Sequence, residues 1–128
     1  EETDGRILAV APLYLKRHSQ GEYVFDHGWA HAWERAGGQY YPKMQVSAPF
    51  SPVAGPRLLA GDAPDSDDSR LTLLRALETV CTNMELSSVH VTFATEHEWK
   101  LMGAAGWIQR VGRQFHWHNG AVGPQTVV

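Results

Sequence analysis

The chain has 128 residues, of which 43% are hydrophobic and 20% charged, enough for one globular domain with a buried core. A formal net charge of −3 argues against a nucleic-acid-binding surface as the main function, because such domains normally carry a basic face. Cys81 is the only cysteine and no apolar run is long enough to span a membrane, so a reducing, cytoplasmic setting is expected.

The first third of the chain predicts two strands and a short helix. Residues 7–15 form an apolar run of strand length, in which Pro12 marks a bulge or an unpaired position. After a turn, residues 22–25 predict a short antiparallel strand. A helix over residues 28–36 should follow, with Asp26 as its cap. Its apolar face is expected to consist of Trp29, Ala32, Trp33 and Ala36.

The middle of the chain predicts a strand, a shaped loop and an acidic turn. Gly37 and Gly38 end the short helix, and residues 41–50 predict the next strand. Residues 51–57, SPVAGPR, contain two prolines and a glycine and predict a loop of fixed shape. Residues 62–68 are acidic and precede a helix, where carboxylates are favourable.

The last part predicts two helices and two strands. The long helix should cover residues 69–86, with an apolar side made of Leu73, Leu74, Leu77, Val80, Cys81 and Met84. Residues 89–94 alternate and are rich in β-branched side chains, which predicts a strand. A short helix over residues 96–105 should end at Gly106, and residues 107–117 predict a final strand.

The order of these elements predicts a single α/β domain. A long helix between two strands implies a right-handed crossover and a parallel pair, whereas the leading strands should be antiparallel. We therefore expect a mixed antiparallel and parallel sheet with helices on both faces. The domain should cover residues 1–118, with residues 119–128 as a flexible tail.

This order resembles the central part of the GNAT (acyl-CoA N-acyltransferase) fold, and residues 103–117, GAAGWIQRVGRQFHW, are similar to the ending of that superfamily. The resemblance implies that the strands before and after the long helix splay apart and hold the acyl donor in the gap. Residues 61–69, GDAPDSDDS, depart from the pattern, because GNAT enzymes commonly cradle a pyrophosphate there and an acidic run would repel it. Met102 stands where a tyrosine acid is common.

A more specific resemblance is carried by residues 21–59, GEYVFDHGWAHAWERAGGQYYPKMQVSAPFSPVAGPRLL, with later matches at 90–93 (HVTF) and 115–117 (FHW). These motifs resemble the FemAB-like family of peptidoglycan biosynthesis or recognition proteins, which are predicted N-acyltransferases. The likeness covers about residues 4–119. Family members are usually longer and have a second similar half, so the chain resembles a fragment or one domain of such a protein, for which exposed strand edges and a homodimer are expected.

Within this resemblance, His90 and His116 are the candidate catalytic residues. A general base must titrate near neutral pH and lie within hydrogen-bond reach of its proton, and either histidine meets this if it is turned into the splay. A structural role for both histidines is the alternative.

The loop over residues 51–57 is the candidate donor site, with Val53, Gly55 and Arg57 as its binding residues. The planar guanidinium of Arg57 is suited to a phosphate or carboxylate. The alternative is a salt bridge between Arg57 and a carboxylate within residues 62–68.

A second candidate site would bind the acceptor through Tyr40, Tyr41, Lys43 and Trp29. Tyrosine rings beside a lysine offer an aromatic platform for an anionic or sugar-bearing ligand. The alternative for Lys43 is a strand edge along which its side chain extends to water. His27 and His31 are four residues apart but lack a convincing third ligand, so no metal site is predicted.

Two functions remain open. The first is an N-acyltransferase or aminoacyltransferase domain that moves an acyl group from acyl-CoA or an aminoacyl donor, neither held as a tight cofactor, to an amine or a peptidoglycan precursor. Backbone amides freed by the splay would stabilise the developing oxyanion. The second is a non-catalytic recognition module that binds cell-wall precursors or a protein partner, which the acidic run at residues 61–69 favours.

Overall fold

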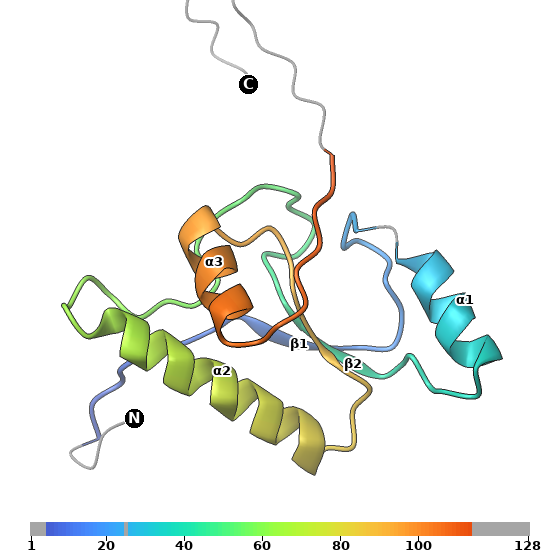
Figure 1. Ribbon diagram of the computed structural model, residues 1–128, viewed down its shortest axis with the longest axis horizontal. Helices are drawn as coiled ribbons and strands as arrows, with labels where there is room; N and C mark the ends of the chain where they lie inside the picture. Colours follow the sequence, from blue (N-terminus) through green and yellow to red (C-terminus); the bar gives the residue numbers. More distant parts are fainter. Residues whose placement is uncertain (1–4, 25, 114–128) are drawn as a thin grey trace, which may run out of the picture.

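The structure is a computed structural model that describes residues 5–24 and 26–113. Its elements are β1 (Leu13–Lys16), α1 (His27–Arg35), β2 (Lys43–Val46), α2 (Ser66–Asn83), β3 (Val89–Val91) and α3 (Glu96–Ala104). The strands form one sheet in the order β1-β2-β3 (Figure 1). β1 and β2 are antiparallel, with Leu13 opposite Val46, and β2 and β3 are parallel, with Met44 opposite Val89. The expected mixed α/β sheet, with a parallel pair around the long helix, is confirmed.

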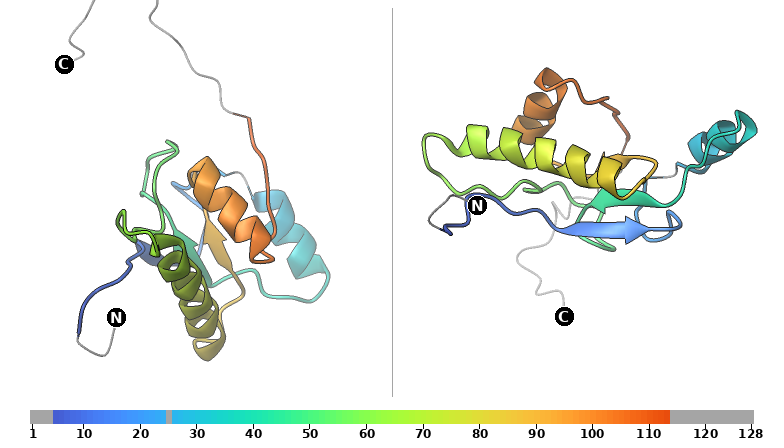
Figure 2. Two further views of the ribbon diagram at one scale, coloured as in Figure 1. Left: turned by 60° about the vertical axis from the view of Figure 1, so that its left-hand side comes forward. Right: turned by 90° about the horizontal axis from the view of Figure 1, so that it is seen from below.

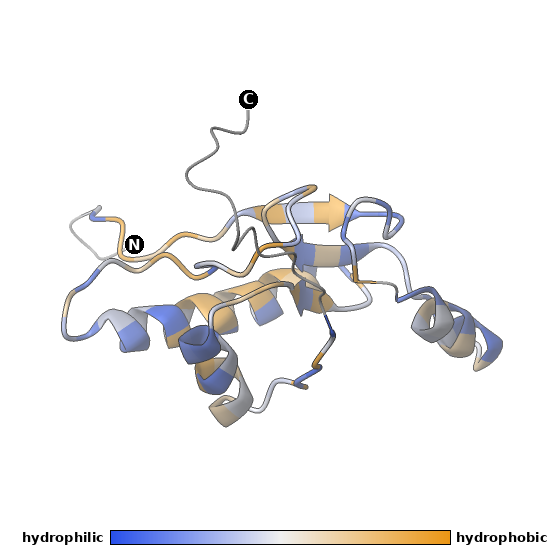
Figure 3. Cartoon of the chain, turned by 90° about the horizontal axis from the view of Figure 1, so that it is seen from above, coloured by the Kyte–Doolittle hydropathy of each residue, from blue (hydrophilic) through white to orange (hydrophobic). Residues whose placement is uncertain are grey.

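The hydrophobic core lies on one face of this sheet. Met44 and Val46 both project onto that face because side chains two apart on a strand point the same way. There they pack with Leu58, Leu74, Leu77, Cys81 and Met102. Each fully buried leucine contributes about 1.5–3 kcal/mol to folding. Figure 3 shows hydrophobic residues interspersed with hydrophilic ones along the strands and α2, whereas α1 is mostly hydrophilic.

The expected placement of helices on both faces of the sheet is not found among the described residues. α2 and α3 contribute Leu74, Leu77 and Met102 to the same core and so cover the same face. α1 lies beyond the ends of the strands (Figure 2). Met102, which stands where the GNAT resemblance expects a tyrosine acid, is a buried core residue.

The helices α2 and α3 form where the sequence predicts them. α2 begins at Ser66, three residues earlier than expected, and carries Asp67 and Asp68 in its first turn, where carboxylates are favourable. On its predicted apolar side Val80 and Met84 are exposed. α3 begins with a capping box between Thr95 and Glu98, which satisfies two amides that the helix itself leaves unpaired.

The predicted strands are shorter than expected, and two of them do not form in the described residues. Val10 makes only an isolated antiparallel bridge with Leu59, and Pro12 separates that bridge from β1. Residues 22–24 are not extended because Tyr23 has a φ of 56°, in the left-handed region. Residues 107–113 form no strand, and the rest of that predicted strand lies outside the described residues.

β1 is an edge strand of the sheet, and Leu13 and Leu15 are partly exposed on it. Such an edge can pair with the edge of another chain, which is the contact that the predicted homodimer would use. Within residues 5–24 and 26–113, no helix has the length and hydropathy needed to cross a bilayer. Residues 119–128, predicted as a flexible tail, lie outside the described residues.

Candidate functional site

A cluster of buried polar side chains surrounds the ammonium group of Lys43. This side chain is 0% exposed, and its Nζ donates hydrogen bonds to Ser19 Oγ at 2.9 Å, Glu22 Oε2 at 2.8 Å and Asp26 Oδ2 at 2.7 Å. An ammonium has three donors, so all three are used. Lys43 is therefore neither a strand-edge side chain in water nor a free cation available to a ligand.

Strand alternation explains why this cluster exists. On β2, Lys43 and Gln45 point to the face opposite Met44 and Val46, and so away from the hydrophobic core. Both are buried nonetheless, and over Lys43 the segment after β1 and the cap residue of α1 place the polar side chains of Ser19, Glu22 and Asp26. Gln45 Nε2 donates to Thr92 Oγ1 at 2.9 Å on the neighbouring strand end.

The two tyrosines before β2 complete the cluster. The hydroxyl of Tyr40 donates to Asp26 Oδ2 at 2.7 Å, and the hydroxyl of Tyr41 shares a hydrogen bond of 2.7 Å with Ser19 Oγ. The two rings meet edge to face, with centroids 5.0 Å apart, and Lys43 Nζ lies 5.4 and 5.8 Å from their centroids. Tyr40, Tyr41 and Lys43 are thus brought together, but Lys43 is buried beneath two half-buried tyrosines and does not belong to an exposed platform.

Asp26 occupies the cap position of α1, yet its side chain makes no cap hydrogen bond, because it binds Lys43 and Tyr40. Burial alone would raise the pKa of Asp26, but the hydrogen bonds headed by that of Lys43 hold the pKa well below its usual range. Burial, and then the Asp26 carboxylate, raise the pKa of Tyr40 above its ordinary value. At neutral pH the pair therefore consists of a carboxylate and a protonated phenol.

His90 lies beside this cluster on β3. Its Nε2 is 2.8 Å from Ser88 Oγ, and its ring meets that of Tyr40 edge-on at 5.8 Å. Burial, followed by the charge of Lys43, lowers the pKa of His90 to about 4, so the imidazole is neutral at pH 7. The other candidate base, His116, lies outside the described residues.

The lowered pKa of His90 predicts a specific loss of stability in mild acid. The unfolded chain, with an ordinary histidine pKa near 6.5, binds more protons than the folded chain between pH 6.5 and about 4, so stability falls as the pH drops through this window. The full effect is at most about 3 kcal/mol. We expect His90→Gln to remove it, so that urea unfolding at pH 7 and pH 4.5 differs less than in the parent chain. His31→Gln, at an exposed position of α1, is the control and should leave the pH dependence unchanged. An identical pH dependence for His90→Gln and the parent would contradict a buried neutral imidazole.

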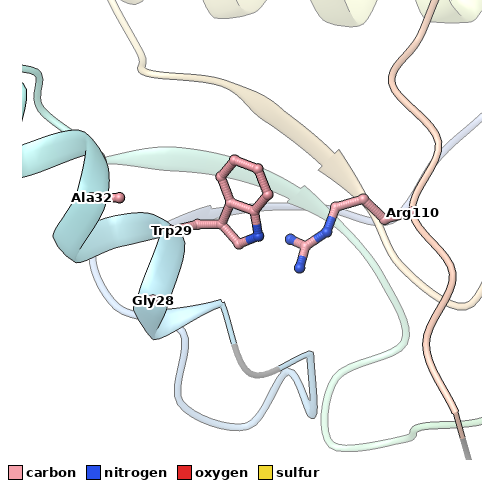
Figure 4. A pocket seen from close by; sticks show the side chains of 4 residues that line it. All are labelled: Gly28, Trp29, Ala32 and Arg110. Carbon is pink, nitrogen blue, oxygen red and sulfur yellow. The ribbon is translucent and has the colours of Figure 1, made fainter.

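An open pocket of about 470 Å³ lies between α1 and the segment after α3. Gly28, Trp29, Ala32 and Arg110 line it (Figure 4). The Trp29 side chain is 61% exposed, and the Arg110 guanidinium lies 5.2 Å from the ring centroid. After burial and Lys43, the charge of Arg110 is also among the causes that lower the pKa of His90. The guanidinium is therefore close enough to the buried cluster to act on it electrostatically.

The predicted apolar face of α1 is not buried. Trp29 and Trp33 are both mostly exposed, and Ala30 is the residue of this helix that is buried. The helix lies beyond the strand ends (Figure 1), and among the described residues neither tryptophan belongs to the hydrophobic core. The ring of Trp33 lies instead against Gly38, where any Cβ atom would collide with it.

The predicted donor loop is fixed to the end of β3. Arg57 is buried, and its guanidinium donates to three main-chain carbonyls, those of Thr92 at 2.9 Å, Val53 at 2.8 Å and Pro56 at 3.2 Å. The alternative, a salt bridge between Arg57 and a carboxylate of residues 62–68, is not found: the guanidinium binds carbonyl oxygens instead. Of the three predicted donor residues, Val53 is exposed, at 65%.

The GNAT resemblance places a gap between the ends of β2 and β3. Here the same loop is hydrogen-bonded to the residues that follow β3. β2 and β3 stay paired up to the amide of Thr92, which donates to Val46 at 3.1 Å. Immediately beyond, the amide of Gly55 donates to the carbonyl of Phe93 at 3.0 Å. Backbone groups at this strand end are thus engaged by residues 53–57.

Within the acidic run, Asp67 has two side-chain partners, His97 and Arg70. Asp67 Oδ1 lies 2.8 Å from His97 Nε2 and 2.8 Å from Arg70 Nη1. The hydrogen bonds from His97 and then Arg70 lower the pKa of the Asp67 carboxyl. In residues 5–24 and 26–113, no group of three or more His, Cys, Asp or Glu side chains is placed to hold a metal ion.

Sequence reasoning missed Ser19, Glu22 and Arg110 as members of the site. Glu22 and Asp26 lie four positions apart just before α1. This spacing was the signal in the sequence that could have predicted two carboxylates around one lysine. Nothing in the local pattern around Arg110 indicated that it would lie over Trp29.

Comparison with known proteins agrees with the resemblance seen in the sequence. A family model described as peptidoglycan biosynthesis/recognition, FemAB-like, matches residues 1–123. No curated protein matches the chain, and no solved structure matches it. Because the family model covers nearly all of the 128 residues, the chain belongs to the FemAB-like family of peptidoglycan biosynthesis and recognition proteins.

Proposed function

We propose that this domain binds a peptidoglycan precursor at the Trp29–Arg110 pocket and takes part in transferring an acyl or aminoacyl group to an amine of that precursor. The cell-wall role is supported by family membership. The observation that carries the binding proposal is an exposed tryptophan ring with a guanidinium 5.2 Å from its centroid, in an open pocket. Such a pair offers a flat apolar surface and a fixed cation for the carboxylates of a precursor peptide.

The transfer proposal rests on the chemistry that N-acylation requires. The amine attacks the carbonyl of the donor, a proton leaves the nitrogen, and the leaving group departs with its electron pair. His90 stays the candidate base among the described residues, because its imidazole is neutral at pH 7 and adjoins Tyr40. Its pKa of about 4 lies below the near-neutral value expected of an efficient general base, so in this proposal His90 is a weak base that passes the proton on to water. The donor, an acyl-CoA or an aminoacyl carrier, would approach the exposed Val53.

Replacing either member of the pocket should weaken precursor binding. We expect Trp29→Ala and Arg110→Ala each to raise the Kd for a muramyl peptide at least tenfold, because one removes the apolar surface and the other the cation. The measurement is a calorimetric or NMR titration of the whole chain. Trp33→Ala is the matched control, since it removes an exposed tryptophan of the same helix that does not line the pocket. Equal affinities for the parent and both pocket variants would rule the pocket out as the binding site.

A second candidate function is precursor recognition without chemistry. Two observations favour it: Arg57 is occupied by main-chain carbonyls, and the start of α2 carries carboxylates where a pyrophosphate would have to lie. This candidate predicts binding of the muramyl peptide with no product formed from acetyl-CoA or from an aminoacyl donor. Turnover that His90→Gln abolishes would instead support transfer.

A further inference from the structure

A second pocket, of about 450 Å³, adjoins the first turn of α1. It is lined by Ser19, Gln20, Gly21, Tyr23, His27 and Phe50. His27 belongs to this pocket, and the next two residues of the helix, Gly28 and Trp29, belong to the Trp29–Arg110 pocket. A ligand that reaches across the beginning of α1 could therefore occupy both pockets at once.

Two aromatic residues of the second pocket are held in an unfavourable backbone conformation. Tyr23 and Phe50 both have a φ of 56°, and they are two of the four non-glycine residues with positive φ in the described part of the chain. This conformation costs free energy for a residue with a bulky side chain, so it persists only where the surroundings enforce it. Strain of this kind is concentrated at binding sites, because it fixes side chains that would otherwise turn away.

The strained backbone leaves both rings facing solvent. Tyr23 is 50% exposed and Phe50 is 76% exposed. The Phe50 ring lies directly over Gly21, where an added Cβ atom would come within 2.5 Å of Phe50 Cε1. Gly21 has a φ of 78°, so only glycine suits this position on both grounds. Neither ring is placed to fill the core. The turn at Tyr23 also directs Glu22 inward to Lys43, whereas no hydrogen bond of this kind accompanies the strained backbone of Phe50.

Uncharged polar groups accompany the rings. Within the described residues, no Asp, Glu, Lys or Arg side chain lines this pocket, whereas Ser19 and Gln20 offer a hydroxyl and an amide. The Ser19 hydroxyl is held in place by Lys43 Nζ at 2.9 Å and by the Tyr41 hydroxyl at 2.7 Å. Aromatic faces with oriented neutral donors and acceptors match a sugar ring, which presents C–H groups on its faces and hydroxyl or amide groups at its edge.

We propose that the second pocket binds a neutral N-acetylated sugar ring, while Arg110 in the first pocket binds a carboxylate of the peptide attached to that sugar. The proposal rests on the function proposed above. It adds which part of the precursor binds in which pocket. The two pockets differ in chemistry as the two parts of such a ligand do: the second has two aromatic rings and no Asp, Glu, Lys or Arg among its described lining residues, whereas the first has the guanidinium of Arg110. The beginning of α1 is the boundary between them.

The test uses the whole chain and three probes: N-acetylglucosamine, the dipeptide L-alanyl-D-glutamate, and N-acetylmuramoyl-L-alanyl-D-isoglutamine, which joins a sugar to a peptide carboxylate. Phe50→Asn removes the ring while keeping a residue that tolerates the left-handed conformation, so its thermal unfolding should match the parent. We expect this variant to raise the Kd for the sugar–peptide conjugate at least fivefold and to leave the dipeptide Kd unchanged. Arg110→Ala should weaken both the conjugate and the dipeptide. Gly21→Ala, which displaces the Phe50 ring, should act as Phe50→Asn does.

The outcomes separate this proposal from the one on which it rests. If the conjugate binds and depends on Arg110, but Phe50→Asn and Gly21→Ala leave its Kd unchanged, the sugar assignment is overturned and the proposed function stands. If neither the conjugate nor the dipeptide binds, the proposed function itself fails. Chemical-shift changes at the amides of Gln20, Gly21 and Tyr23 on addition of N-acetylglucosamine alone would support the sugar assignment directly.

Discussion

Replacing Lys43 by methionine is expected to destabilise the folded chain by about 3–5 kcal/mol, because it leaves two buried carboxylates without their shared cation. Glu22 and Asp26 are both almost fully buried, and their oxygens Oε1 and Oδ1 already lack a hydrogen-bond partner. Removing Lys43 Nζ would take away the hydrogen bonds of 2.8 and 2.7 Å that offset the burial of these charges. Urea-induced unfolding at pH 7, followed by tryptophan fluorescence, measures the loss.

A triple variant provides the sharpest control. Combining Lys43→Met with Glu22→Gln and Asp26→Asn removes both charges along with their partner, so most of the lost stability should return. Lys16→Met tests the outer part of the cluster, since Lys16 Nζ is 3.7 Å from Glu22 Oε1 and partly exposed. This change should cost much less than Lys43→Met. If Lys43→Met were as stable as the parent chain, the cluster could not be an ionised buried network.

Replacing Glu98 by alanine should have an effect of similar size, about 3–5 kcal/mol, since buried amides lose their acceptor. Glu98 is 2% exposed. Its Oε1 accepts from the amides of Arg57 at 2.7 Å and Leu58 at 2.6 Å, and its Oε2 accepts from the amide and hydroxyl of Thr95. One carboxylate therefore begins α3 and fixes the loop that carries Arg57. Thermal unfolding of Glu98→Ala measures the loss.

The pH dependence of this effect follows from the pKa of Glu98. Burial alone would raise the pKa, but the amides of Leu58 and Arg57, with the Thr95 groups, lower it below its ordinary value. A lowered folded pKa means that the contribution is fully present above the unfolded pKa, near 4.3, and is lost as the pH falls below that value. The difference in stability between the parent chain and Glu98→Gln should therefore shrink between pH 5 and pH 3. Glu96 is the control: its pair with Lys100 also lowers the pKa of its carboxyl, but this pair is exposed and screened by water, so Glu96→Gln should show a much smaller change over the same range. A difference that stayed constant across this range would contradict an ionised Glu98.

The sequence was sufficient to predict the elements whose pattern is local. α2 is long enough for its apolar period to be visible in the sequence, and Gly106 marks the end of α3. The parallel pairing of β2 with β3 followed from the helix between them. The strand predicted at residues 22–25 was wrong for a tertiary reason: Glu22 turns inward to bind Lys43, and Tyr23 leaves the extended conformation.

The candidate site depended on contacts that no local pattern contains. Ser19, Glu22 and Asp26 reach Lys43 from 17 to 24 residues away in the sequence. Tyr40, Tyr41 and Lys43 lie together, as their closeness in the sequence suggests, but the burial of Lys43 depends on Asp26 at the start of α1 and on Ser19 and Glu22 after β1. Arg57 was predicted to meet an anion, and it binds carbonyls instead because the loop folds back onto the end of β3.

The weak burial of α1 has a consequence for any molecule that binds on both sides of its first turn. This helix buries Ala30 alone among its residues, and its cap residue Asp26 is attached to the sheet through Lys43 and Tyr40. A segment anchored by so few apolar groups opens at low free-energy cost. Ligand binding would therefore carry the entropic cost of immobilising this helix. Substitutions that hold the helix more firmly against the sheet would lower the Kd without contacting the ligand.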